Sequence, residues 1–273
     1  MRVGLLPNEG GGSYRFVIIA LAIVGILISS LPVIVVTIMS FSAADNTGFP
    51  PEALSLRWYW DVIALFTADD ASSAQSVVDS TLTSLLVAVI VMGISTFVCI
   101  PLAYALARGD RRIRGGMELL FTLPLVFPLV ILGIAFLLIA ESLRVDIGIW
   151  RIVIPHVALV LPFVLRNCLG AMNGISVEIE EAAVSLGASP LRAICDVVIP
   201  LMKAGILAGL IFALIISFNE FTITFFMYTI DVSTLPIWMY SRTVSSLDPS
   251  TLALSVFIIA ADVLLIVLVD KLI

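Results

Sequence analysis

Six long apolar runs alternate with polar connections along the chain. They cover residues 16–41, 82–107, 119–140, 152–169, 205–227 and 251–270. Apolar runs of about 17–25 residues are long enough to cross the hydrocarbon core of a bilayer as helices. The first run is too long for the apolar core of a cleaved signal peptide, so we expect it to be retained. The pattern predicts an all-α integral membrane protein with a cytoplasmic N-terminal segment, 1–15, and a single transmembrane domain, 16–273.

The distribution of positive charge predicts the orientation of these spans. With the N-terminus inside, ten of the 14 Lys and Arg residues fall on the inner side and four in outer loops. Four of the inner ten are Arg108, Arg111, Arg112 and Arg114. Because Lys and Arg concentrate on the cytoplasmic side, both termini are expected in the cytoplasm of a bacterial inner membrane.

Composition excludes several classes of protein. The chain is 61% hydrophobic and only 12% charged, which fits neither a soluble globular domain nor a disordered chain. A net charge of −6 with two lysines leaves no basic face, so no nucleic-acid partner is expected. The three cysteines show no metal-ligand spacing and are interpreted as small buried apolar residues; no metal site is expected.

The connection at 42–81 is long and acidic, with six acidic residues against Arg57. At its centre lies the sequence Leu-Arg-Trp-Tyr-Trp, residues 56–60. Aromatic side chains of this kind are enriched at the membrane–water interface. We interpret the segment as an interfacial anchor in contact with lipid; the alternative is a docking surface for an external partner.

The inner connection at 170–204 has helical periodicity in two pieces. One face of the first piece comprises Ile175, Ile179, Ala182, Ala183 and Leu186, and the opposite face Glu178, Glu181 and Ser185. Gly187 is expected to stop this helix in the left-handed conformation. Ser189 and Pro190 then start a second helix as N-cap and first residue, and Pro200 is expected to end it. Periodicity alone is compatible with a plain cytoplasmic hairpin, whereas an exposed acidic face beside small alanines favours a shape that fits a groove on another protein.

The residues of this connection resemble a known motif. Glu181, Ala182 and Ala183 are followed after three residues by Gly187, and thirteen residues later by Pro200. This spacing resembles the Glu-Ala-Ala loop of the permeases of ABC importers, in which Glu-Ala-Ala, three residues, Gly, nine residues, Ile, one residue and Leu-Pro follow one another. Val197 and Ile199 replace the Ile and Leu of that pattern, and both replacements keep an apolar side chain.

The resemblance extends over most of the chain and is closest to permeases of spermidine/putrescine importers. It includes Trp58-Tyr59, the sequence Leu-Ala-Tyr-Ala-Leu-Ala-Arg at 102–108, and Ser-Phe-Asn-Glu-Phe at 217–221. It implies the type I importer fold, with the inner loop as a coupling helix on a dimer of cytoplasmic ATPase subunits. A second, different permease subunit and a periplasmic solute-binding protein are the further implied partners. The implied ATPase-coupling residues are Glu178, Glu181, Ala182, Ala183, Leu186, Gly187, Pro190 and Leu191.

Catalytic motifs are missing from the sequence. Neither lysine follows a glycine, so there is no Walker A motif, and ATP and Mg are expected on the partner ATPase rather than in this chain. His156 lies in an apolar run without a carboxylate near it in sequence, and we interpret it as packed. The chain is therefore not expected to be an enzyme. The alternative function is a stand-alone secondary transporter or channel, for which an inverted repeat would be expected.

Acidic residues inside two spans are the candidate solute contacts. Glu220, preceded by Asn219, lies in the outer half of the fifth run, and Asp262 lies near the middle of the sixth. An ionisable residue at a helix centre costs about 2.5–3.5 kcal/mol on insertion scales, so it needs a partner. These three residues are predicted to line the translocation path, with a neighbouring helix or a subunit interface as the alternative partner. Their charge favours a cationic solute such as a polyamine.

Overall fold

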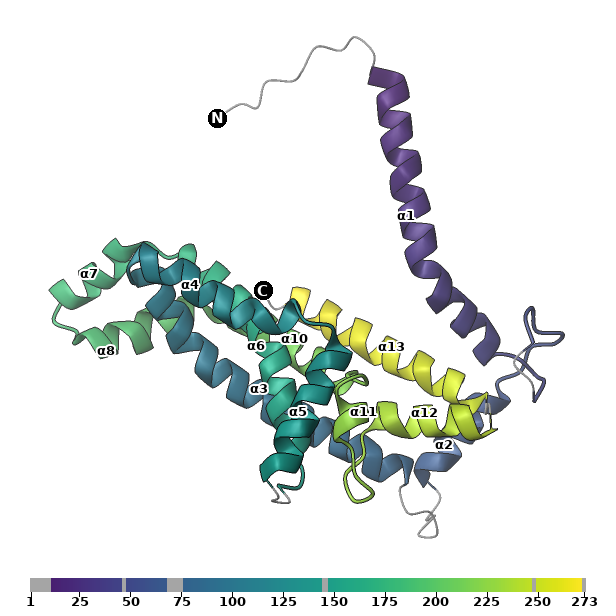
Figure 1. The fold of residues 1–273 in the computed structure, drawn as a ribbon. Coiled ribbons are helices and arrows are strands. Elements are labelled where there is room, and N and C mark those ends of the chain that lie inside the picture. The colour runs from purple at the N-terminus through teal and green to yellow at the C-terminus, as the bar shows by residue number, and fades with distance from the viewer. Residues whose placement is uncertain (1–10, 46–47, 68–75, 144–146, 247–248, 272–273) are drawn as a thin grey trace. The chain divides into compact units, whose positions relative to one another are not determined.

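The computed structural model describes residues 11–45, 48–67, 76–143, 147–246 and 249–271 (Figure 1). Within these ranges the regular structure is helical, apart from an isolated β-bridge between Ser42 and Leu54, which confirms the all-α class. Most of the predicted segment 1–15, together with Asp69, Asp70 and Arg144, lies outside the described residues. The helices are α1 (Gly11–Ser40), α2 (Arg57–Thr67), α3 (Val77–Arg108), α4 (Arg111–Thr122), the 3-10 helix η1 (Leu123–Leu125), α5 (Leu129–Leu143), α6 (Trp150–Asn173), α7 (Val177–Ser185), α8 (Pro190–Ala193), the π-helix η2 (Ile194–Val198), α9 (Ile199–Leu201), α10 (Lys203–Phe218), α11 (Thr224–Met227), α12 (Leu235–Ser246) and α13 (Ser250–Asp270).

Four of the described helices, α1, α3, α6 and α13, are each long and apolar enough to cross a membrane. They correspond to the first, second, fourth and sixth predicted spans. Two further pairs of helices meet the same criterion only when they are taken together across a sharp bend. The third and fifth runs are therefore where the structure differs from six simple spans.

The third run is not a continuous helix. The segment Arg114–Leu125 and the helix Leu129–Leu143 meet at a bend of 93°. Pro128 stands immediately before α5. Proline lacks an N–H and disfavours the helical conformation of the residue before it, which favours a break of the helix at Phe127.

The fifth run is also interrupted. Helix α10 ends at Phe218, and α11 begins only at Thr224, so the predicted helix across 205–227 is broken before its outer end. On the other side of α10, Pro200 does not end the second piece of the inner loop, because helical structure continues to Leu201. A π-helix precedes this proline. The wider turn accommodates a ring that would clash with the carbonyl four residues earlier in an α-helix.

The chain divides into two compact units, and the prediction of one membrane domain stays a prediction. The first comprises the described parts of Met1–Ile63 and Leu247–Ile258. Here the hydroxyls of Ser40 and Tyr59 lie 2.7 Å apart, and the indole N–H of Trp58 donates to the carbonyl of Ser42 at 2.8 Å. These bonds hold the start of α2 against the C-terminal end of α1.

The second unit, Ala64–Ser246 and Ile259–Ile273, holds the main core. Helices α3, α6 and α10 pack against one another there. A Cβ at Gly205 would lie 2.6 Å from the carbonyl oxygen of Asn167, and one at Gly209 would lie 3.2 Å from the Val164 side chain. Two glycines four residues apart thus bring the backbones of α6 and α10 into close contact, as small residues do between membrane helices.

Candidate functional site

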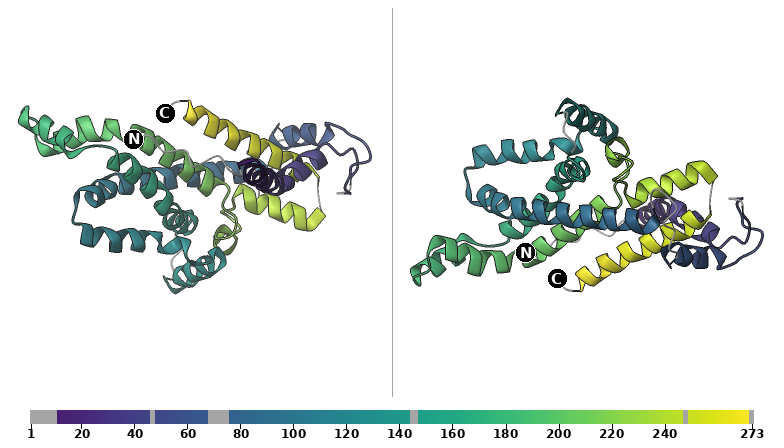
Figure 2. Two further views of the ribbon diagram at one scale, coloured as in Figure 1. Left: turned by 90° about the horizontal axis from the view of Figure 1, so that it is seen from above. Right: turned by 90° about the horizontal axis from the view of Figure 1, so that it is seen from below.

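Helices α7 and α8 form a helix–glycine–helix hairpin at one end of the second unit (Figure 1, Figure 2). Gly187 has φ 96°, the left-handed conformation expected from the sequence. Its N–H donates to Val184, and the N–H of Ala188 donates to Ala183, which is the Schellman pattern of a helix end. The Ser189 hydroxyl accepts a hydrogen bond from the N–H of Arg192, with Pro190 as the first helical residue. The predicted corner is confirmed.

The tip of this hairpin exposes large apolar side chains. Leu186 is 90% exposed and Leu191 is 71% exposed, and they stand on either side of Gly187. Glu178, Glu181, Ala182 and Pro190 are exposed as well, whereas Ala183 is half-buried. The hydrogen bonds from its own backbone N–H and from the Ser176 hydroxyl hold the pKa of the Glu178 carboxyl below its usual range. The hairpin thus exposes two leucines together with two carboxylates, and the lowered pKa of Glu178 keeps that carboxylate ionised at neutral pH.

One acid of α7 is not exposed, and sequence periodicity did not single it out. The Glu180 carboxylate accepts hydrogen bonds from Arg108 and from the Tyr104 hydroxyl, both on α3. The sequence does contain a signal for these donors. Tyr104 and Arg108 are four residues apart and therefore share one face of α3.

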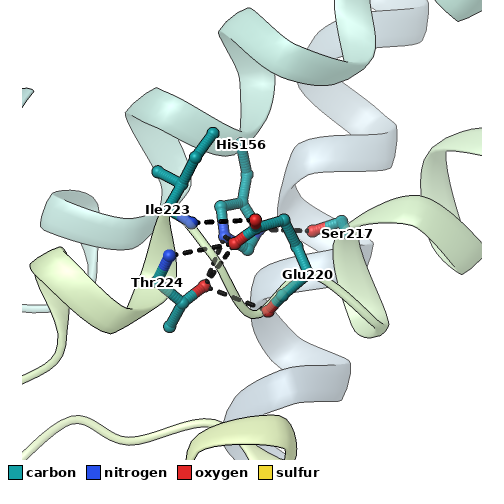
Figure 3. Close-up of polar contacts among 5 residues, drawn as sticks. All are labelled: His156, Ser217, Glu220, Ile223 and Thr224. Atoms are coloured by element: carbon teal, nitrogen blue, oxygen red, sulfur yellow. Dashed lines mark hydrogen bonds and ion pairs between the residues drawn. The ribbon is translucent and has the colours of Figure 1, made fainter. Parts of the chain in front are cut away.

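Glu220 lies in the interruption between α10 and α11, inside a buried polar network (Figure 3). One carboxylate oxygen accepts from the N–H of Ile223 at 2.8 Å, and the other from the N–H and the hydroxyl of Thr224, each at 2.9 Å. The carboxylate therefore satisfies N–H groups at the start of α11. Only 7% of Glu220 is exposed, so its oxygens are occupied by groups of this chain.

His156 of α6 completes the network (Figure 3). Its Nδ1 lies 2.9 Å from the Ser217 hydroxyl, and its Nε2 lies 2.8 Å from the Thr224 hydroxyl and 3.4 Å from Glu220. The ring is fully buried. His156 is thus packed, as expected, but a carboxylate lies beside it that is distant in sequence. The network joins α6, α10 and α11, and no local pattern could have indicated it.

Asn219 and Asp262 lie together and apart from this network. The side-chain amide of Asn219 donates to the Asp262 carboxylate at 2.9 Å. Asn219 is exposed and Asp262 is half-buried. The three predicted path residues therefore separate into the accessible pair Asn219 and Asp262 and the buried Glu220. Within the described ranges, no group of three or more His, Cys, Asp or Glu residues is placed to hold a metal ion.

Several known proteins are similar to this chain. The permease protein PotC of the spermidine/putrescine transport system of Haemophilus influenzae is 23% identical over 87% of this chain and 89% of its own length. PotC of Escherichia coli is 22% identical over 87% and 86%. The putrescine transport system permease protein PotI of Escherichia coli is 30% identical over 55% and 56%.

A solved structure has the same fold. It is the crystal structure of a bacterial ABC transporter involved in the import of the acidic polysaccharide alginate, with a TM-score of 0.60 over 98% of each chain at 19% identity. A family model described as a binding-protein-dependent transport system inner membrane component matches residues 98–273. That match covers more than half of the sequence and includes the helix–glycine–helix hairpin. The chain therefore belongs to the family of inner membrane components of binding-protein-dependent transport systems, the permease components of ABC importers.

Proposed function

We propose that this permease forms half of a solute path and couples it to a cytoplasmic ATPase through α7 and α8. The exposed tip of the hairpin is the observation that carries this proposal. Leu186 and Leu191 flank a fixed glycine corner, and the exposed Glu178 and Glu181 add negative charge. An apolar helical tip beside charged groups has the character of a segment that inserts into a groove of another protein.

The proposed partners are those that the family implies. A dimer of ATPase subunits binds ATP and Mg and receives the hairpin of each permease. A second permease subunit forms the other half of the path, and a periplasmic binding protein delivers the solute. The family depends on binding proteins, which favours this function over a stand-alone secondary transporter or channel.

The proposed solute is a small organic cation of the polyamine type. The permeases PotC and PotI, named for spermidine and putrescine transport, are relatives at 22–30% identity. Asp262 supplies an accessible carboxylate within α13, held by Asn219 of the interrupted fifth run. Such a group in a membrane helix needs water, a solute or a neighbouring helix as its partner. A protonated amine would satisfy it by a charge-assisted hydrogen bond.

Replacing Asp262 by Asn should therefore impair uptake of putrescine or spermidine. A hydrogen bond to a charged group contributes about 1.5–3 kcal/mol, which corresponds to roughly a tenfold or larger loss of apparent affinity. Uptake of radiolabelled polyamine into proteoliposomes that contain the complete complex measures the effect, with basal ATP hydrolysis recorded in parallel.

Asp270→Asn is the matched control, because Asp270 is an exposed acid at the end of the same helix. It should leave uptake unchanged. Equal affinities for polyamine in the Asp262→Asn variant and the unmodified complex would contradict the proposed role of this residue.

The proposed orientation places the hairpin in the cytoplasm and the 42–81 connection outside. Cys195 of η2 is exposed, whereas Cys99 and Cys168 are buried. In intact cells, a membrane-impermeant maleimide should leave Cys195 unlabelled and should label a Glu52→Cys variant. Cell lysis should then expose Cys195 to the reagent. Labelling of Cys195 before lysis would contradict the proposed orientation.

A further inference from the structure

One acid of α7, Glu180, is largely shielded from solvent and is hydrogen-bonded to α3. We propose that Glu180, held by Arg108 and Tyr104 of α3, is a positioning residue that transmits movement of the coupling hairpin to the transmembrane core. The inference rests on the proposed function of the hairpin and assigns its mechanical connection.

The contacts form a junction of three segments. The Arg108 guanidinium donates through Nε to Oε1 of Glu180 at 2.8 Å, and through a terminal nitrogen to the same carboxylate. That terminal nitrogen also donates to the carbonyl of Ile175 at 3.0 Å. The Tyr104 hydroxyl donates to the other carboxylate oxygen at 3.1 Å. One arginine therefore binds both the corner that follows α6 and the first turns of α7.

Burial distinguishes this pair from the other arginine–carboxylate pairs of the second unit within the described ranges. The side chains of Arg108 and Glu180 are 17% and 12% exposed. The pair Arg114–Glu118 on α4 is 32% and 40% exposed and lies within a single helix. Exposed pairs of the latter kind contribute little, whereas loss of one partner from a shielded pair leaves a charge without compensation.

The remainder of α7 lies largely outside the core. No residue of α7 is buried, and Glu178 and Glu181, on either side of Glu180, are exposed. Arg108 is the last residue of α3, a helix whose residues Cys99, Ala103 and Leu106 belong to the main core. A force on the hairpin therefore reaches α3 through the guanidinium–carboxylate contact. Several donors bind this carboxylate, so they fix the distance and the orientation of Glu180 relative to α3.

The geometry separates two tasks within the hairpin of α7 and α8. The exposed tip binds the ATPase, and Glu180 connects that tip to the core. Loss of the connection should leave assembly intact and weaken the response of ATP hydrolysis to solute, because the binding surface persists while its movement no longer bears on α3.

The test compares Glu180→Gln, Arg108→Lys and the control Glu118→Gln in the complete complex. We expect Glu180→Gln to retain the ATPase subunits and basal hydrolysis. Its stimulation by solute-loaded binding protein should fall about tenfold, within the usual range of coupling between distant sites. Arg108→Lys keeps the charge but cannot make the two-nitrogen contact, and it should weaken stimulation in the same direction. Glu118→Gln should behave as the unmodified complex.

A double variant adds a test that does not depend on stability. If Arg108 and Glu180 act through one contact, combining the two substitutions should reduce stimulation no further than the stronger single change. Additive losses, or full stimulation in Glu180→Gln, would overturn the inference. Loss of the ATPase from Glu180→Gln would also overturn it, because Glu180 would then belong to the docking surface. A failure of the unmodified complex to bind any ATPase would instead contradict the proposed function.

Discussion

A Gly187→Val substitution should abolish most solute-driven transport while the permease still inserts into the membrane. Gly187 has φ 96°, and a Cβ there would meet nothing within 4 Å. The effect therefore comes from backbone strain alone. A left-handed conformation costs an L-residue about 1–2 kcal/mol, and more when the residue is β-branched. The corner should rotate, displacing Leu186 relative to Leu191. Binding of the ATPase to the purified permease should weaken by roughly tenfold or more.

Gly148→Val is the control for backbone strain that arises outside the hairpin. Gly148 also has a positive φ, 53°, with open space for a Cβ, but it lies in the turn before α6. It should reduce yield no less than Gly187→Val and leave ATPase binding intact. Ser185→Ala, on α7 itself, should have only a small effect. If Gly187→Val retains assembly and solute-stimulated hydrolysis, the coupling role of the hairpin is wrong.

Glu220→Gln should lower the thermal stability of the complex. Both carboxylate oxygens accept backbone N–H groups, from Ile223 and Thr224. A glutamine offers one accepting oxygen, so one N–H would face an NH₂ group. A buried donor without an acceptor costs about 1–3 kcal/mol. The melting temperature of the detergent-solubilised complex should therefore fall, and the fluorescence of its tryptophans reports the transition.

Glu118→Gln is the comparison for this effect. Glu118 pairs with Arg114 on the same helix, both side chains are about a third or more exposed, and such pairs contribute about 0–1 kcal/mol. Uptake per folded molecule distinguishes the two roles considered for Glu220. If Glu220 only stabilises the packing of α6, α10 and α11, Glu220→Gln lowers the melting temperature and leaves uptake by the molecules that remain folded unchanged. An unchanged melting temperature, with loss of a cationic solute and not of a neutral analogue, would favour a path contact instead.

The helices of this fold were largely predictable because their apolar runs are long. Their interruptions were not, since the effect of a proline depends on what surrounds it. Pro155 and Pro162 lie inside an unbroken α6, most of whose span is buried, whereas Pro128 coincides with a sharp bend. Neighbouring helices can accommodate the backbone groups that a proline frees, and a single sequence does not show which helices are neighbours.

The site was predictable where its determinants are local. Gly187, Ser189 and Pro190 specify their own turn, and the structure has that turn. The contacts of His156 with Glu220 and of Arg108 with Glu180 join distant parts of the chain. The pattern of charges within α7 pointed to Glu178 and Glu181 as coupling residues and not to Glu180. The donors to Glu180 come from α3, so the sequence of α7 alone does not reveal its role.

The close contact of α6 with α10 also bears on how the fifth run can move. Gly205 and Gly209 leave no space for a side chain between the two helices, so sliding or rotation of α10 against α6 would separate surfaces that nothing else fills. The chain bends by 68° just before α10 and is not helical between Phe218 and Thr224 just after it. Helix α10 is thus held against α6 by this close contact, and the chain departs from a straight helix at both ends of α10. Displacement of the hairpin, or of the chain that follows Phe218, would change a few backbone torsions at the two ends of α10 and would leave the helix itself undistorted.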